Sequence, residues 1–177
     1  MIPKTIAFLL AAASGVQSAQ VPAADKGERP DYSLSIRAKQ AETRVGSQVT
    51  IEVVQTNMSD HQLTTSAGSG PDEAAVFYKT YVYGGDGALA PETKFGRRVR
   101  TEKDDPGETT VIVGEALLRY LQPGGSLRDE ITLNRLYELS KPGKYTVQVQ
   151  GLDSAGRVAK SNTVTIIITS GPKGAAK

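Results

Sequence analysis

Apolar side chains recur at every second position along most of this chain, and that spacing constrains its fold more than any other feature. In "DYSLSIRA", Tyr32, Leu34 and Ile36 alternate with polar residues, and "QVTIEVVQTN" repeats the pattern around Val49 and Ile51. Alternation with period two is typical of strands with one buried face, whereas an amphipathic helix repeats every 3.6 residues. Further extended segments are expected at residues 59–66, 73–83, 109–114, 116–122, 126–133, 144–153 and 158–169.

Turn signals punctuate these segments at intervals of roughly ten residues. Gly84–Gly87 ("GGDG"), Pro123–Gly125 and Pro142–Gly143 are the clearest, because Gly and Asp tolerate positive φ and proline fixes a bend. No long helical pattern interrupts the series. The chain is therefore predicted to be all-β, an immunoglobulin-like antiparallel β-sandwich with a short helical turn, residues 134–139, before the penultimate strand.

Two internal segments carry further expectations. Residues 74–83 have apolar side chains on both parities, which is typical of a central strand. Residues 94–108, "KFGRRVRTEKDDPGE", are the most polar internal stretch and are expected to be a strand fragment followed by an exposed loop.

The N-terminus has the order of a secretory signal peptide. A basic start at Lys4 precedes the apolar run 6–13, and small and polar residues follow it. The run is shorter than the roughly 20 apolar residues that span a membrane. We expect a signal peptide over 1–18, a flexible lead-in over 19–30, one sandwich domain over 31–169 and a flexible tail over 170–177. The protein is expected to be secreted or periplasmic.

Composition narrows the chemistry. The chain has no cysteine, which excludes disulfides, iron–sulfur clusters, thiolate zinc sites and cysteine nucleophiles. The net charge is +2 with acidic and basic residues interspersed, so we expect neither nucleic acid nor an anionic membrane as partner. We also expect no cofactor, no membrane span and a monomer.

A corner in "LSKPGKYTVQVQ" is the strongest local signature. Tyr145 follows Pro142-Gly143 at the start of a strand, where immunoglobulin-like sandwiches place a tyrosine whose hydroxyl bonds to upstream backbone. Val147 then occupies the position of the disulfide cysteine of antibody domains. We expect Ile51 or Val53 to face it across the core.

With these residues in view, the segment "LQPGGSLRDEITLNRLYELSKPGKYTVQVQ…GRVAKSNTVTIII" resembles the C-terminal half of secreted bacterial Ig-like domains of uncharacterised function. "VGSQVTIEVVQTNMSDHQL" fits their N-terminal half more loosely. The resemblance covers about 145 residues and implies a fold, not an activity. The chain is more weakly similar to BsuPI-type proteinase inhibitors, which also have a proline–glycine pair before a late strand.

No catalytic or metal site is predicted. His61 is the one histidine of the chain, and its neighbour Asp60 points away from it on an extended backbone. Loop carboxylates at Asp86, Asp104 and Asp105 match no calcium-loop pattern. Asp129 and Glu130 should face opposite sides of a strand, so they cannot act as a pair.

The cations Arg97, Arg98 and Arg100 are the predicted partner-binding residues. They lie between acidic residues, which favours an intramolecular solvated surface, and a contact surface for an acidic partner or a polysaccharide is the other interpretation. Aromatic residues 77, 78, 81 and 83 are expected in the core rather than on a carbohydrate-binding surface.

The chain is thus predicted to be an exported, non-catalytic Ig-like module for protein interaction or structural support, with an unknown protein or cell-envelope component as partner. The alternatives are a secreted protease inhibitor presenting residues 84–110, a carbohydrate-binding module and a small hydrolase.

Overall fold

The computed structural model describes residues 29–67, 71–101 and 117–171. The strands are β1 (Tyr32–Ala38), β2 (Glu42–Arg44), β3 (Thr50–Asn57), β4 (Leu63–Ala67), β5 (Lys79–Tyr83), β6 (Leu117–Leu121), β7 (Ser126–Thr132), β8 (Gly143–Leu152), β9 (Val158–Lys160) and β10 (Val164–Thr169). The helices are α1 (Pro71–Phe77), α2 (Lys94–Thr101) and α3 (Leu133–Leu136). The expected signal peptide at 1–18 and the strand at 109–114 lie outside the described residues.

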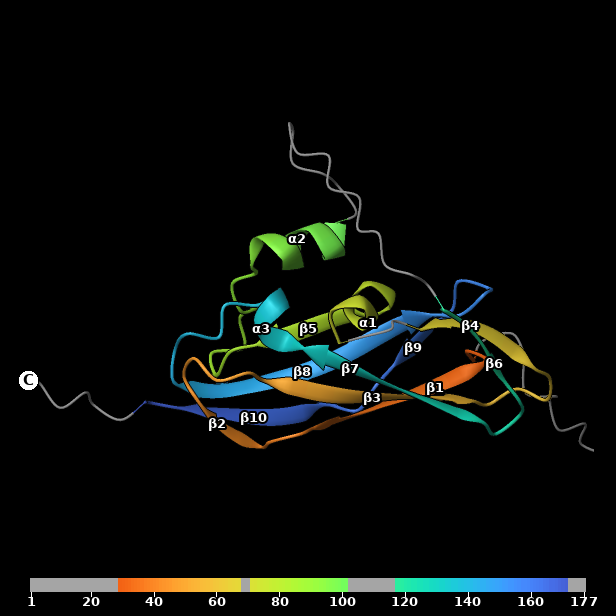
Figure 1. Cartoon of the computed structure of the whole chain (residues 1–177), viewed down its shortest axis with the longest axis horizontal. Helices are drawn as coiled ribbons and strands as arrows, with labels where there is room; N and C mark the ends of the chain where they lie inside the picture. The colour runs from red at the N-terminus through yellow and green to blue at the C-terminus, as the bar shows by residue number, and fades with distance from the viewer. Residues whose placement is uncertain (1–28, 68–70, 102–116, 172–177) are drawn as a thin grey trace, which may run out of the picture.

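Two sheets form a sandwich. One has the strand order β1-β3-β7, and the other has the order β2-β10-β8-β5, with β9 also paired to β8. Except for β2, which runs parallel to β10, the neighbours are antiparallel. This arrangement matches the A-B-E and G-F-C strands of immunoglobulin domains and confirms the predicted fold class. A two-stranded ribbon, β4-β6, extends one end, and the three helices lie together on one side (Figure 1).

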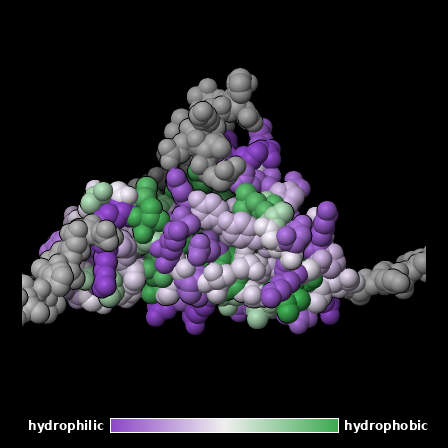
Figure 2. Space-filling model, turned by 180° about the vertical axis from the view of Figure 1, so that it is seen from behind, coloured by the Kyte–Doolittle hydropathy of each residue, from purple (hydrophilic) through white to green (hydrophobic). Residues whose placement is uncertain are grey.

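The core lies where the alternating side chains of the two sheets meet. Ile51, Val53 and Ile131 of the first sheet are fully buried, and so are Val82 and Val147 of the second. Burying a Val or Ile side chain contributes about 1.5–3 kcal/mol, so this interface supplies much of the driving force for folding. On the exposed surface, apolar residues form small groups among hydrophilic ones (Figure 2).

The tyrosine corner is confirmed. The Tyr145 hydroxyl donates a hydrogen bond to the Lys141 carbonyl at 2.9 Å, and its side chain is buried. Val147, two residues later, is fully buried in the position predicted for it. The helical turn before β8 is also present, but α3 begins at Leu133, one residue before the predicted start.

The last segment of the sheet contains a β-bulge. Residues 150 and 160 are paired between β8 and β9, whereas residues 147 and 164 are paired between β8 and β10. The register therefore changes by one residue at Ser161–Thr163, which inserts an extra residue into the strand. The bulge turns Asn162 toward the other sheet, where its side-chain amide accepts from Ile36 N at 2.8 Å and donates to Ile36 O at 3.0 Å.

Asn57 fastens the β4-β6 ribbon to the end of β3. Its Nδ2 donates to the carbonyls of His61 and Leu121, and its Oδ1 accepts from the backbone N–H and the hydroxyl of Ser59. The residue is 1% exposed. Although Asn57 heads an Asn-x-Ser tripeptide, its amide is thus held inside the fold.

Two sequence predictions were wrong. Residues 74–77 of the expected central strand belong to α1, and β5, which holds most of the rest, is an edge strand of its sheet. Pro, Asp and Glu begin α1 and two buried alanines follow, a composition that favours a helix start.

The expected strand fragment and loop at 94–108 contains α2 over 94–101, and residues 102–108 are outside the described residues. Phe95 and Val99, spaced i and i+4, pack against the core as a helical face. Only two apolar residues mark this helical period, and the many charged residues around them made it hard to recognise in the sequence. Within the described residues, no helix is long and apolar enough to cross a membrane.

Candidate functional site

The predicted partner-binding arginines lie on α2, the helix farthest from the sheets in Figure 1. Arg97 is exposed and Arg98 is half-buried, whereas the side chain of Arg100 is outside the described residues. Gly96 sets the position of the helix, because a Cβ there would lie 2.0 Å from the carbonyl oxygen of Leu136. The backbone of α2 therefore approaches the end of α3 as closely as a residue without a side chain permits.

Thr93 holds the start of α2. Its hydroxyl accepts a hydrogen bond from Gly96 N at 2.9 Å, the geometry of a helix N-cap, and it donates to the carbonyl of Arg135 on α3. Thr93 N in turn donates to the Leu136 carbonyl at 3.0 Å. These contacts fix α2 to α3, so the side chains of the two helices form one surface.

Two guanidinium groups flank one aromatic ring on that surface. The Cζ atoms of Arg98 and Arg135 lie 5.9 Å and 5.1 Å from the centre of the Phe95 ring, within the range of cation–π attraction. Arg97 donates to the Glu92 carbonyl at 2.8 Å. The structure thus adds Arg135 to the predicted set, which sequence reasoning missed because it lies about 40 residues away on the chain.

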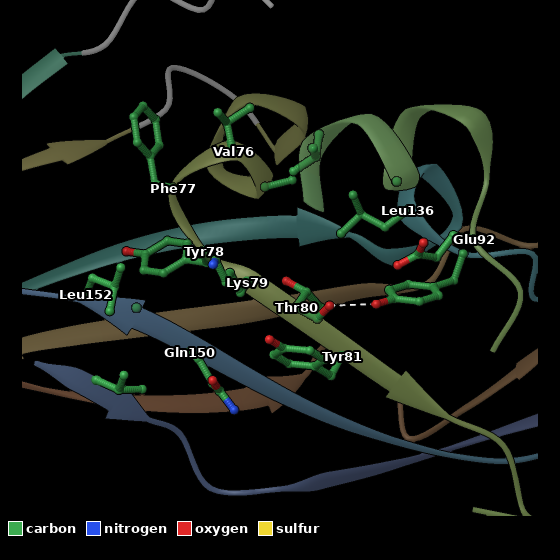
Figure 3. A pocket seen from close by; sticks show the side chains of 16 residues that line it. Val76, Phe77, Tyr78, Lys79, Thr80, Tyr81, Glu92, Leu136, Gln150 and Leu152 are labelled. Atoms are coloured by element: carbon green, nitrogen blue, oxygen red, sulfur yellow. Dashed lines mark hydrogen bonds between the residues drawn. The ribbon is translucent and has the colours of Figure 1, made fainter. Parts of the chain in front are cut away.

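A cavity of about 300 Å³ lies on the other side of α2 (Figure 3). Val76 of α1 and Leu136 of α3 line it from above, and Thr80 and Tyr81 of β5 line it from below. The Tyr137 hydroxyl donates to the Thr80 carbonyl at 2.6 Å. The Thr80 hydroxyl is buried and has no hydrogen-bond partner among the described residues, an arrangement that costs free energy unless a polar group reaches it.

The histidine and the loop carboxylates considered for catalysis or metal binding do not form a common site among the described residues. His61 is exposed, and its Nδ1 lies 3.3 Å from Asp60, so the two residues are closer than predicted. Asp86 accepts from Ala88 N at 3.0 Å within its turn, while Asp104 and Asp105 lie outside the described residues. In the described part of the chain no three His, Asp or Glu side chains are placed to hold one metal ion.

The aromatic residues divide between core and surface. Tyr78 is buried as predicted, but Phe77 is half-buried at the end of α1, and Tyr81 and Tyr83 lie on the outer face of β5. The expected inhibitory segment 84–110 is a tight turn at 84–87 followed by α2, as far as residue 101. Residues 102–110 of it lie outside the described residues.

Asp129 and Glu130 face opposite sides of β7, as predicted. Glu130 is half-buried and pairs with Lys39 at 2.5 Å. Asp129 is buried, and its Oδ2 accepts from the Tyr78 hydroxyl at 2.9 Å. Burial raises the pKa of Asp129, although the Tyr78 hydrogen bond and the charge of Arg119 act in the opposite direction. The carboxyl is thus less stable as an anion in the fold than in water.

This raised pKa predicts the effect of Asp129→Asn. A folded-state pKa above the unfolded value means that ionised Asp129 weakens the fold at neutral pH and that its protonation relieves the cost. We expect Asp129→Asn to be more stable than the parent at pH 7. The difference should vanish below the unfolded pKa of about 3.9, where the parent carboxyl is protonated in both states.

Urea denaturation at pH 7 and at pH 3 measures this effect, and Glu130→Gln, on the exposed face of the same strand, is the control. An Asp129→Asn difference that is equal at the two pH values would contradict the prediction.

Comparisons with known proteins come from structure. No protein-family model matches the chain, and no curated protein is significantly similar to it. The CARDB domain of a Pyrococcus furiosus protein, solved in complex with di-metal ions, matches with 14% identity over 81% of this chain and 97% of that chain, at a TM-score of 0.39. In fold, the chain is similar to a CARDB domain.

Two β-glucosidases also match. The enzyme of Erythrobacter marinus is 11% identical over 79% of this chain and 16% of its own, with a TM-score of 0.40. The enzyme of Listeria innocua is 15% identical over 80% of this chain and 16% of its own, with a TM-score of 0.38. These likenesses concern the β fold and assign no activity to this chain.

Proposed function

We propose that this chain is an exported, non-catalytic Ig-like module that binds a protein partner in the cell envelope or outside the cell. The signal-peptide pattern of residues 1–18 supports export. The observation that best supports binding is that the guanidinium groups of Arg98 and Arg135 both lie over the Phe95 ring. Arginine is enriched in protein interfaces because its planar group stacks on rings and bonds carboxylates bidentately.

The basic residues of α2 indicate the charge of the partner. Lys94 and Arg97 are exposed on the helix, and Arg98 is half-buried beside them. The helix dipole favours acidic side chains in the first turn of a helix, but α2 has none there. The dipole therefore does not account for the basic residues of this helix. A partner surface rich in Asp and Glu would complement this face.

The double substitution Arg97→Ala with Arg98→Ala tests the proposal. The tagged parent and variant capture proteins from periplasmic and secreted fractions at low and high salt, and the proteins captured by the parent are identified and purified. We expect the variant to bind the purified partner at least tenfold more weakly at low salt. The difference should shrink at high salt, because exposed charges are screened.

Lys79→Ala with Lys160→Ala, two exposed cations on the outer face of the second sheet, is the matched control. Arg98 is half-buried, so the loss of its cation–π contact costs between about 0.5 and 2 kcal/mol, and the melting temperature of the arginine variant should fall by only a few degrees. Equal binding by parent and arginine variant at low salt would remove the proposal.

A further inference from the structure

A second and more polar cavity lies beside the first, since Phe77, Tyr78 and Leu152 line both. Its volume is about 510 Å³, within the range of about 300–1,000 Å³ typical of small-molecule sites. The start of β1, the β4 segment and the turn between β8 and β9 enclose it. None of these elements carries the basic residues of α2, so this site is independent of the function proposed above.

A buried amide is the central polar group of the wall. Gln55 is 3% exposed. Its Oε1 accepts from the Thr65 hydroxyl at 3.2 Å and lies 3.3 Å from the Tyr78 hydroxyl, whose single proton is donated to Asp129 at 2.9 Å. Its Nε2 donates no hydrogen bond to any residue that the structure describes. Nε2 is not among the fully buried atoms without a partner, so it is open to the cavity and can donate to a ligand oxygen there.

The carboxylates of the wall are already engaged. Asp153 accepts from the backbone N–H groups of Asp31, Ala155 and Arg157 and from Arg157 Nε at 2.7 Å. Arg157 also pairs with Asp31 at 2.7 Å. Burial opposes ionisation of Asp153, but these hydrogen bonds lower its pKa overall. With their oxygens committed to these donors, the two acids are poorly placed to take a metal ion.

Apart from His61, the remaining polar lining residues carry neutral groups. Burial and the nearby Asp153 raise the pKa of Tyr32 to about 12, so it stays a phenol at physiological pH. Thr64, Ser66 and Ser154 also line the cavity. No Lys or Arg is among the described lining residues, which disfavours phosphate or another anion as ligand.

Apolar surface alternates with these groups. Phe77 and Leu152 form part of the wall and lie next to the hydroxyl and amide donors. A wall of this kind suits a ligand with many neutral hydroxyl groups and an apolar C–H face, because the hydroxyls can both donate and accept. We propose that this cavity binds a small neutral polyhydroxylated ligand, a mono- or disaccharide unit, through Gln55, Thr65 and Tyr78.

Titration of the ¹⁵N-labelled protein with glucose, N-acetylglucosamine and cellobiose, followed by NMR, tests the site. We expect at least one of these sugars to cause saturable shifts of the Gln55 side-chain amide and of the backbone around residues 64–66 and 153–155. Ser154→Trp, at an exposed turn position, should obstruct the cavity and weaken binding at least tenfold. Ser140→Trp, exposed at the opposite end of β8, is the matched control and should leave binding unchanged.

Thr65→Val offers a second variant if Ser154→Trp does not fold, since it removes one hydroxyl at nearly constant volume. It should also weaken binding. The absence of saturable shifts at tens of millimolar of all three sugars would overturn the proposal. So would shifts that are the same in the Ser154→Trp protein, or shifts centred on Tyr81 and Tyr83, which would place the sugar on the outer face of the sheet.

Discussion

Replacing Tyr145 with Ala is expected to lower the free energy of unfolding by about 3 kcal/mol, since removing a buried aromatic side chain leaves a cavity. The ring is 8% exposed beneath the corner that leads into β8. The substitution also removes the hydrogen bond from the Tyr145 hydroxyl to the Lys141 carbonyl. Both effects act on the same corner, so the loss is large for a domain whose total stability is about 5–15 kcal/mol.

Tyr145→Phe separates the two contributions. It keeps the ring and removes only the hydroxyl, so we expect a loss of about 1 kcal/mol. Urea denaturation followed by circular dichroism measures both variants against the parent. If Tyr145→Ala lowered the free energy of unfolding no more than Tyr145→Phe, the ring would contribute nothing to packing. The structural role inferred for the corner would then be contradicted.

Asn57→Ala is expected to destabilise the fold by a similar amount, on the order of 3 kcal/mol. The side chain makes four hydrogen bonds, two through Nδ2 and two through Oδ1. Alanine leaves the buried carbonyl of Leu121 without this donor, and an unsatisfied buried group costs about 1–3 kcal/mol.

The neighbouring Met58→Ala is the control. Met58 is 65% exposed, and a surface substitution of this kind usually changes stability by about 0.5 kcal/mol or less. Thermal or urea unfolding of the two variants gives the comparison. Hydrogen exchange adds a local measurement, because β4 and β6 should lose protection before β3 and β8 in Asn57→Ala. Equal stabilities of the two variants would show that the ribbon is held by other contacts.

The sequence predicted the sandwich because strands and turns are local patterns. Tyr145 and Val147 could be placed from a seven-residue segment, since proline and glycine fix the corner and alternation fixes the buried face. The turn of α3 was predicted, but α1 and α2 were missed because each is at most eight residues long, too short for a 3.6-residue period to exceed the surrounding alternation.

The candidate sites depend on contacts that local patterns do not contain. Arg98 was predicted, but Arg135 joins it only because Gly96 lets α2 approach α3. The polar cavity joins Gln55 of β3 to Tyr78, which follows α1, and to the turn after β8. In the sequence Gln55 is only a polar residue inside an apolar strand. Its burial beside a tyrosine hydroxyl becomes visible when the sheets are packed.

Asn162 also changes what one edge of the sandwich can bind. β1 is an edge strand of its sheet, and an unpaired edge can recruit a strand from another molecule. The amide of Asn162 occupies both the N–H and the carbonyl of Ile36 on that edge. A single side chain thereby takes the place that an incoming strand would need in the middle of β1, and bulges and covered edges are devices by which natural sheets limit edge-to-edge pairing.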